Sequence, residues 1–483
     1  MSRNAPPPDA GGSFRRSLTL FDGVMLVAGV MIGSGIFIVS ADIARTVGGT
    51  GWMMLVWVLG GFMTVVAALS YGELSGMYPG AGGQYVYLRE AYNPLIAFLY
   101  GWALFTVIQT GLIAVVAVAF AKYAAYIFPW LGEDIPLLSL GGFSISVAQA
   151  LAILMIVFLT WVNSGSIRNG KIIQRIFTSA KILAMVFLVA AGIFLGARAG
   201  IWHANWADAW DSFHYVTTQV DGKAVSTAVP HHGLLLIAMI GVAMVGSLFS
   251  SDAWNSVTFI AAEIKNPHRN VGLSLLLGTF LVTVIYLLCN LVYIAALPIK
   301  EIAFAPADRV AAAASLNIFG PYGAIVIAAM IMISTFGCDN GIVLSGARVY
   351  YAMANDGLFF KRAGRLNKAG VPAYGLWIQC IWASVLCISG RYSDLLNYII
   401  FVVLIFYMLT IAGIFILRKK YPDMPRPYRA VGYPVLPVIY ILMGMVVCIS
   451  LLIYRPLYTW PGLIIVLLGV PVYYLTLRKT RTS

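Results

Sequence analysis

The sequence predicts an all-α membrane protein with about twelve transmembrane helices, and three observations support this prediction. First, 61% of the 483 residues are hydrophobic and only 10% are charged, a composition typical of proteins whose solvent is lipid. Second, apolar stretches of about 20 residues, long enough to cross a hydrocarbon core of about 30 Å, recur along the whole chain. Third, Lys and Arg, which outnumber Asp and Glu by 31 to 18, gather in alternate loops.

The apolar stretches follow one another with no soluble domain between them. We expect spans near residues 20–46, 52–77, 95–128, 147–164, 171–197, 234–262, 271–297, 320–350, 373–389, 395–417, 434–453 and 460–477. A segment of residues 1–19 precedes them, a long loop (198–233) separates the fifth from the sixth, and a tail (478–483) follows. The first apolar run is too long for a signal-peptide core, so no cleavage is expected.

Loop charge predicts the orientation. Roughly three times as many Lys and Arg fall on the side of the two termini as on the other side, so both termini are expected in the cytoplasm and the chain in the cell (inner) membrane. Because topology accounts for the positive charge, no nucleic-acid partner is expected. All five cysteines lie inside apolar runs, so the sequence predicts neither a metal site nor a cofactor.

Two of the expected spans are interrupted near their middle. The first contains Gly33-Ser34-Gly35, and glycine inside a helix costs about 1 kcal/mol relative to alanine. The sixth contains a polar run that ends in Asp252, and a carboxylate at this depth costs about 2.5–3.5 kcal/mol, so it is expected to face protein, water or a ligand. The alternatives are a seam of small residues between packed helices, and a carboxylate that caps a broken helix.

The interrupted spans occupy equivalent places in the chain. Each is the first of a block of five, residues 20–197 and 234–417, and residues 418–477 add two more spans. This pattern is typical of transporters built from inverted repeats. A half-helix that begins at an interruption exposes N–H groups suited to a carboxylate, and one that ends there exposes carbonyls suited to an ammonium group. Together they indicate a site for a zwitterionic amino acid.

Further polar residues lie inside the apolar runs. Lys181 is about ten residues into the fifth span, roughly 15 Å deep, where it cannot easily reach the interface. An amine at that depth must be paired, neutral or functional. For Glu73, Glu263 and Asp339 with Asn340, hydrogen bonding between helices is the favoured interpretation.

Five motifs in order along the chain carry a family resemblance. They are "GSGIF" (33–37), "YGELSGMYPGAGGQYVYLREAY" (71–92), "FTSAKILA" (177–184), "FSSDAWNSVTFIAAEIKNPHRN" (249–270) and "GARVYYAMANDGLFF" (346–360). The chain resembles the amino acid-polyamine-organocation superfamily, most of all the L-amino acid transporter type and its bacterial relatives. The resemblance implies the leucine-transporter fold, a 5+5 inverted repeat plus two helices, with helices 1 and 6 unwound at mid-membrane.

The resemblance also implies that the two interruptions bind the substrate. Amides of the first would receive its carboxylate, carbonyls of both would receive its amino group, and side chains of the second would close the far end of the pocket. In that order, the groups are the amides of Gly33, Ser34 and Gly35, the carbonyls of Met31, Phe249 and Asp252, and the side chains of Trp254 and Asn255. The Phe249 side chain would act as an aromatic gate over the pocket, and Ile32, Ser250 and Ser251 complete the set. Ordinary aromatic packing remains the alternative for Phe249 and Trp254.

In sodium-independent members of the superfamily, a lysine at the position of Lys181 takes the place of a sodium ion. It bridges the backbone of helix 1 to helix 8, where Ser334 and Thr335 are the expected partners. The resemblance therefore implies transport without sodium, and a merely structural ammonium is the alternative. Amino acid exchange and proton-coupled uptake are both compatible with such a lysine.

The expected function is transport of neutral L-amino acids by alternating access. The alternatives are a cationic amino acid or polyamine transporter, in which Asp252 pairs with an amine, and a membrane receptor that senses amino acids without moving them. No zinc-binding helix motif, phosphate loop or serine elbow predicts an enzyme. Heteromeric relatives attach a glycoprotein through a cysteine between helices 3 and 4, and residues 129–144 contain none; no disulfide-linked heavy subunit is expected.

Two departures from the family pattern concern the cytoplasmic side. Gly80 and Gln84 stand where relatives often carry charged residues, and Glu263 follows an alanine instead of a second acid. The contacts that close this side are therefore expected to differ.

Overall fold

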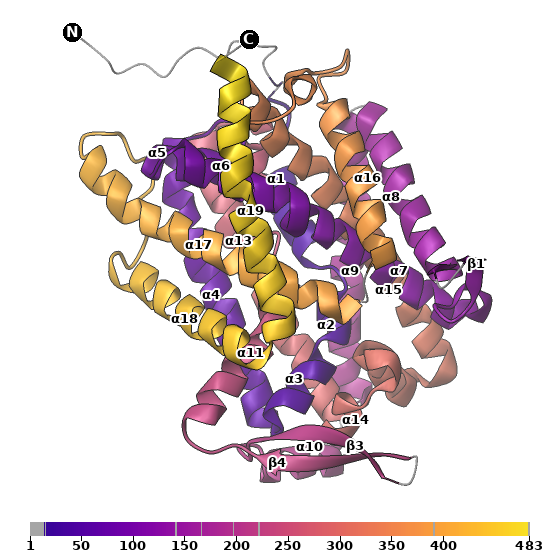
Figure 1. Ribbon diagram of the computed structural model, residues 1–483. Coiled ribbons are helices and arrows are strands. Elements are labelled where there is room, and N and C mark those ends of the chain that lie inside the picture. The colour runs from indigo at the N-terminus through magenta and orange to yellow at the C-terminus, as the bar shows by residue number, and fades with distance from the viewer. Residues whose placement is uncertain are drawn as a thin grey trace.

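The computed structural model describes residues 14, 16–140, 143–165, 167–196, 198–220, 223–389 and 392–481. The expected N-terminal segment (1–19) and the end of the expected tail therefore lie largely or partly outside the described residues. Helices make up most of the described chain (Figure 1). In the first half they are α1 (Leu20–Met31), α2 (Gly35–Ile38), α3 (Ser40–Val47), α4 (Thr50–Met77), α5 (Gln84–Ala91), α6 (Pro94–Ala103), the π-helical η1 (Leu104–Ile108), α7 (Gln109–Ile127), η2 (Pro129–Leu131), α8 (Val147–Gly165), α9 (Ile167–Ala191), the π-helical η3 (Gly192–Gly196) and α10 (Ala199–Ala207).

The second half continues the same pattern. Its helices are α11 (Leu234–Ser250), α12 (Ser256–Phe259), η4 (Ala261–Glu263), α13 (Pro267–Ala296), α14 (Ile299–Ala303), η5 (Pro306–Asp308), α15 (Val310–Asn355), η6 (Lys361–Gly364), α16 (Ala373–Ser389), α17 (Tyr392–Lys420), α18 (Val435–Tyr454) and α19 (Pro456–Arg481). Two antiparallel hairpins, β1 (Pro136–Leu140) with β2 (Phe143–Ser146) and β3 (Phe213–Val220) with β4 (Lys223–Pro230), lie in loops. The sequence analysis did not predict these hairpins.

The described helices account for every expected span. Nine are long and apolar enough to cross a membrane, and three shorter apolar helices, Leu234–Ser250, Ala373–Ile388 and Thr459–Leu475, fill the remaining places. The predicted all-α membrane fold is thus confirmed. The expected span 320–350 belongs to the longer α15, which is interrupted at Gly320 (φ 75°), a left-handed conformation that glycine adopts without a Cβ clash.

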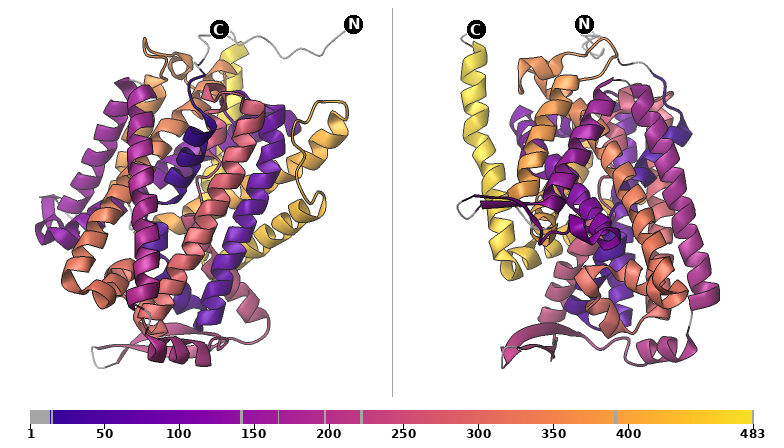
Figure 2. Two further views of the ribbon diagram at one scale, coloured as in Figure 1. Left: turned by 180° about the vertical axis from the view of Figure 1, so that it is seen from behind. Right: turned by 90° about the vertical axis from the view of Figure 1, so that its right-hand side faces the viewer.

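Equivalent helices of the two halves pack against each other. The second helices of the two blocks, α4 and α13, lie side by side, and so do the third, α7 and α15, and the fourth, α8 and α16. A pseudo-two-fold axis between inverted repeats brings equivalent elements together in this way. The last helix, α19, lies at the periphery, against α6 and α17 (Figure 2).

The β3–β4 hairpin and α10 form a cap at the end of the molecule opposite the end of α19 (Figures 1 and 2). Backbone hydrogen bonds anchor this cap to the α3–α4 turn: the amides of Gly49 and Gly51 donate to the carbonyls of Asp211 and Ala209, each at 2.8 Å. The cap therefore holds the outer end of the first interrupted helix.

The cap contains a histidine pair, of which His231 is buried. The rings of His214 and His231 stack with centroids 4.9 Å apart, and their facing nitrogens are 2.8 Å apart. The other ring nitrogen of His231 lies 2.9 Å from the Ser212 hydroxyl. Burial, aided by the neighbouring His214 and His232, lowers the pKa of His231 to about 4, so this ring stays neutral at physiological pH.

Candidate functional site

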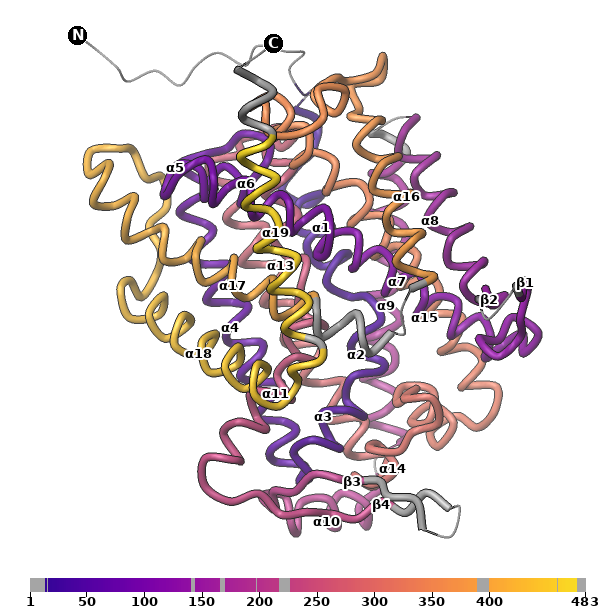
Figure 3. The backbone as a smooth tube through the Cα atoms, in the orientation of Figure 1, coloured from indigo at the N-terminus to yellow at the C-terminus, as the bar shows by residue number. Residues whose placement is uncertain are grey.

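The first interruption separates α1 from α2. The helix ends at Met31, and the amide of Gly33 turns back to the Met31 carbonyl at 2.8 Å instead of continuing the helical pattern. The chain can be followed from α1 through this turn into α2 and α3 in Figure 3. Val39 keeps right-handed helical dihedrals (φ −71°, ψ −17°), so α2 and α3 form one nearly continuous helical segment.

The end of α1 leaves carbonyls that its own helix cannot satisfy, and side chains from three other helices cap them. The Cys338 thiol of α15 donates to Val30 at 2.9 Å, and the Tyr286 hydroxyl of α13 lies 2.8 Å from the Met31 carbonyl. Lys181 of α9 donates to the carbonyls of Gly29 and Ile32. Side chains of α9, α13 and α15 thus stabilise the interruption.

The second interruption separates α11 from α12. The helix ends at Ser250 and resumes at Ser256, and between them Ala253 has a φ of 62°. A left-handed alanine is strained, and such strain gathers at functional sites. The Asp252 amide donates back to the Phe249 carbonyl at 3.1 Å, which closes the end of α11.

The two interruptions touch each other. The Tyr286 hydroxyl lies 2.8 Å from the Met31 carbonyl and 2.9 Å from the Ser250 carbonyl, so one group bridges the ends of α1 and α11. At Gly35, a Cβ atom would fall 2.3 Å from Ser250 Oγ and 2.7 Å from Ser250 Cα. Only a residue without a side chain fits here. The prediction that helices 1 and 6 are both unwound at mid-membrane is confirmed.

A small cavity lies where the interruptions meet. Apolar side chains from other helices, including Leu112 and Val116 of α7 and Ile342 of α15, also line it. Seven of the residues expected to bind substrate line it: Met31, Gly33, Ser34, Gly35, Phe249, Ser250 and Asp252. Among the other four, Ile32 and Ser251 are buried but do not line this cavity, and Trp254 and Asn255 lie beside neighbouring ones.

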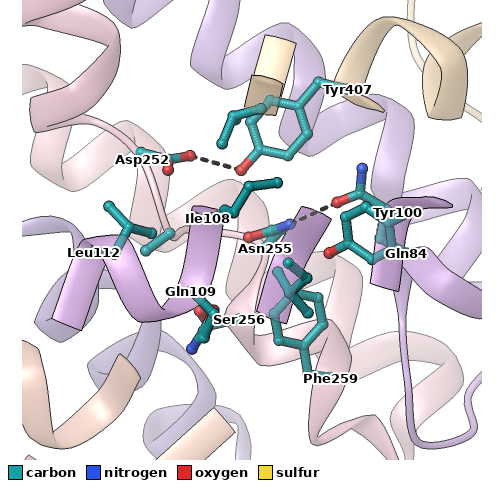
Figure 4. Close-up of a pocket in the computed structure, with 13 residues that line it drawn as sticks. Gln84, Tyr100, Ile108, Gln109, Leu112, Asp252, Asn255, Ser256, Phe259 and Tyr407 are labelled. Atoms are coloured by element: carbon teal, nitrogen blue, oxygen red, sulfur yellow. Dashed lines mark hydrogen bonds between the residues drawn. The ribbon is translucent and has the colours of Figure 1, made fainter. Parts of the chain in front are cut away.

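A second small cavity adjoins the first at Leu112, Asp252 and Ala253 (Figure 4). Polar groups line it from five helices, α5, α6, α7, α12 and α17, and from the interruption between α11 and α12. Tyr407 of α17 donates to Asp252 Oδ1 at 2.7 Å, and Asn255 donates to Gln84 Oε1 at 2.9 Å. Gln84, which departs from the family pattern, thus lines this cavity. Asp252 lines both cavities.

The π-helical segment η1 shapes the same cavity. Leu104, Ile108 and the following Gln109 line it, and the Gln109 amide donates to the Ile342 carbonyl at 2.6 Å. Single π-helical turns inside α-helices are frequent at functional sites. The sequence analysis missed Gln109, Tyr286 and Tyr407, because a polar or aromatic residue in an apolar run has the same pattern as a packing residue.

Trp254 lines a third small cavity, which Asp252 also lines. The indole is 2% exposed, and its centroid lies 4.8 Å from that of Tyr71 and 5.2 Å from that of Tyr407. Aromatic pairs in such edge and tilted arrangements stabilise beyond the area they bury. Trp254 therefore packs against other aromatic rings and lines a neighbouring cavity; its expected role at the side-chain end of the substrate pocket stays a prediction.

Lys181 is 1% exposed and bridges the helices named from the sequence. Its ammonium group donates to Gly29 and to Ile32 (2.8 Å) in α1, and lies 3.4 Å from the Ser334 carbonyl in α15. The Ser334 hydroxyl also donates to Ile32, at 3.0 Å. Thr335, by contrast, donates to carbonyls of its own helix, so it does not take the place expected for it beside Lys181.

Buried acids near the site follow the expected pattern with one exception. Glu263 pairs with the fully buried Arg348 at 3.0 Å, and Glu73 accepts two bonds from Arg418, at 2.9 and 2.7 Å. Buried ions of this kind require a partner. Asp339 is the exception, since neither of its oxygens has a hydrogen-bond partner among the described residues. Hydrogen bonding between helices is therefore the wrong interpretation for Asp339.

A bundle of apolar helices in which two broken helices meet at a cavity is the architecture of a carrier of small solutes. A model of the amino acid permease family matches residues 18–474. The chain belongs to this family, whose members are permeases and not enzymes.

Relatives of known function cover nearly the whole chain. The large neutral amino acids transporter small subunit 2 of Homo sapiens is 29% identical over 98% of this chain and 83% of its own length. The b(0,+)-type amino acid transporter 1 is 28% identical in Homo sapiens, over 96% of this chain and 88% of its own length, and 27% identical in Mus musculus with the same coverage. The resemblance to the L-amino acid transporter type is confirmed.

Proposed function

We propose that this permease transports neutral L-amino acids by alternating access and without sodium. The observation that carries the proposal is the meeting of two opposite helix ends at one cavity. The segment that begins at Gly35 presents amides suited to a carboxylate, and the ends of α1 and α11 present carbonyls suited to an ammonium group. A zwitterionic amino acid carries a carboxylate and an ammonium group on one small molecule, so it can bind both helix ends at once.

The apolar side chains that line the cavity support neutral substrates. Leu112, Val116 and Ile342 offer only apolar atoms to a substrate side chain, so an aliphatic side chain gains from burial there. A second candidate is a cationic amino acid or polyamine, and Asp252 favours it: the carboxylate borders all three cavities. Its bond to Tyr407 offsets part of the attraction for an amine.

Lys181 supports the absence of a sodium requirement. Its ammonium group already binds the Gly29 and Ile32 carbonyls, not the Met31 carbonyl that lines the cavity, and lies beside α15. A sodium ion that bridged α1 to α15 would need these same two carbonyls. Two positive charges cannot share one set of carbonyls without strong repulsion. The lysine is thus a permanent substitute for an exchangeable ion.

Counterflow in proteoliposomes tests transport and sodium together. Vesicles loaded with unlabelled amino acids are diluted into a labelled mixture of the twenty amino acids, in sodium and in choline buffers. We expect saturable label entry that is equal in the two buffers. An amino acid receptor that does not transport would bind label without counterflow, and entry in sodium alone would contradict the role of Lys181.

Location and partners are part of the same proposal. We place the protein in the cell membrane with both termini in the cytoplasm, on the evidence of loop charge. The loop between α7 and α8, which contains the β1–β2 hairpin, has no cysteine. We therefore propose that the chain works without a disulfide-linked subunit.

A further inference from the structure

Asp339 is a buried acid that the proposed transport site does not use. It lies in α15, is 0% exposed, and neither carboxyl oxygen has a hydrogen-bond partner among the residues that the structure describes. The other buried acids differ: Glu263 and Glu73 pair with arginines, and Asp252 accepts from Tyr407. Each of these has a donor that stabilises its charge.

An ionised Asp339 would be an uncompensated charge in an apolar interior. Such a charge costs far more than a neutral acid, and buried groups escape the cost by taking up a proton. Asp339 therefore carries a proton in this state of the molecule. Asp339 differs from a structural hydrogen-bonding residue, because its carboxyl group makes no hydrogen bond to any residue that the structure describes.

The surroundings of Asp339 offer no charge that could replace the proton. Among the described residues, the titratable side chains that interact electrostatically with Asp339 are thiols: Cys380 and Cys387 from α16, and the adjacent Cys338 in α15. The packed helix α8 contains no titratable residue between Val147 and Gly165. Lys181 of α9 approaches α15 at Ser334 instead.

Both sequence neighbours of Asp339 touch parts of the transport machinery. The Cys338 thiol caps the Val30 carbonyl at 2.9 Å and lines the cavity between the interruptions. Asn340 donates to Gly170 (3.2 Å) and Gln174 (3.1 Å) of α9, the helix of Lys181. A shift of α1 or α9 relative to α15 must therefore alter the packing around Asp339.

We propose that Asp339 is a proton-binding site that couples amino acid transport to the pH gradient. The proposal rests on the proposed transport function. In this state the O–H bond is intact; when the packing around α15 opens to water, that bond breaks, the proton passes to water and a carboxylate remains. Rebinding of a proton from the other side restores the neutral acid and permits closure.

Asp339→Asn tests the proposal, because the amide has the size of the neutral acid but cannot release a proton. Wild type and variant are reconstituted in proteoliposomes with the labelled mixture of twenty amino acids. A gradient of one pH unit, acidic outside, is worth a factor of up to ten in accumulation for one coupled proton. We expect wild type to approach tenfold accumulation, and the variant to accumulate nothing above equilibrium while keeping counterflow. Asp423→Asn, the same change at an exposed loop residue, should behave as wild type.

The outcomes separate this proposal from the transport function. Absence of counterflow in wild type would refute transport itself. Normal counterflow in wild type without any response to the gradient would overturn the role of Asp339, and so would a full gradient response in Asp339→Asn. If the variant does not fold, infrared spectra of the wild-type protein test the proposal instead. The proposal requires the absorption band of a protonated carboxyl group at neutral pH, and this band must shift when substrate binds. A spectrum that does not shift would contradict the proposal.

Discussion

Replacement of Gly35 with alanine is expected to reduce transport at least tenfold. The new methyl group would lie 2.7 Å from the Ser250 backbone, so the two interrupted helices would have to move apart. Overpacking of this kind costs about 1–3 kcal/mol even where side chains can adjust, and here the obstacle is backbone. Because a factor of ten corresponds to about 1.4 kcal/mol, counterflow should fall at least tenfold.

Two other glycines provide matched controls for this prediction. At Gly80 a Cβ atom would meet nothing within 4 Å, so Gly80→Ala should transport as wild type. At Gly33 the nearest atom is the Cys338 thiol at 3.0 Å, a side chain that can rotate, so Gly33→Ala should lie between the two. Equal activity of all three variants would show that the interruptions do not need their close contact.

Replacement of Lys181 with methionine is expected to destabilise the protein and to abolish transport. Methionine keeps a similar volume but leaves the Gly29 carbonyl without its donor and the Ile32 carbonyl with only the Ser334 hydroxyl. A buried carbonyl that loses its partner costs about 1–3 kcal/mol. The melting temperature should therefore fall, and counterflow should drop about a hundredfold, because the end of α1 loses its geometry.

Lys122→Met is the control for Lys181. Lys122 lies near the end of α7, away from both interruptions, and its replacement should leave counterflow close to wild type. Full counterflow in Lys181→Met would show that the ammonium group is not needed to hold the end of α1. It would also remove the argument for sodium independence.

Much of this architecture could be predicted because polar residues and glycines inside a membrane-spanning helix are costly and therefore stand out in the sequence. Gly33-Ser34-Gly35, Asp252 and Lys181 each violate an apolar helical pattern, and such violations are costly in lipid. The structure places all of them at or beside the two interruptions. Residues that interrupt an apolar helical pattern, with no partner evident in the sequence, were the signals that located the site.

The remaining features leave no such mark in the sequence. Tyr286 bridges the two interruptions, but a tyrosine in an apolar helix is equally typical of packing. The π-helical η1 needs one extra residue per turn and no particular composition. Ser334 and Thr335 point to different faces of α15, because successive residues of a helix lie about 100° apart, and the sequence did not reveal which one faces α1.

The central claim is that one cavity binds both poles of a zwitterion, and ligand-induced thermal stabilisation tests it most directly. The amino acid that raises the melting temperature most is compared with its amide and its N-acetyl derivative, since a ligand that binds the folded state stabilises it by mass action. We predict that the parent amino acid stabilises the protein and that neither derivative does at the same concentration. Equal stabilisation by either derivative would contradict the claim.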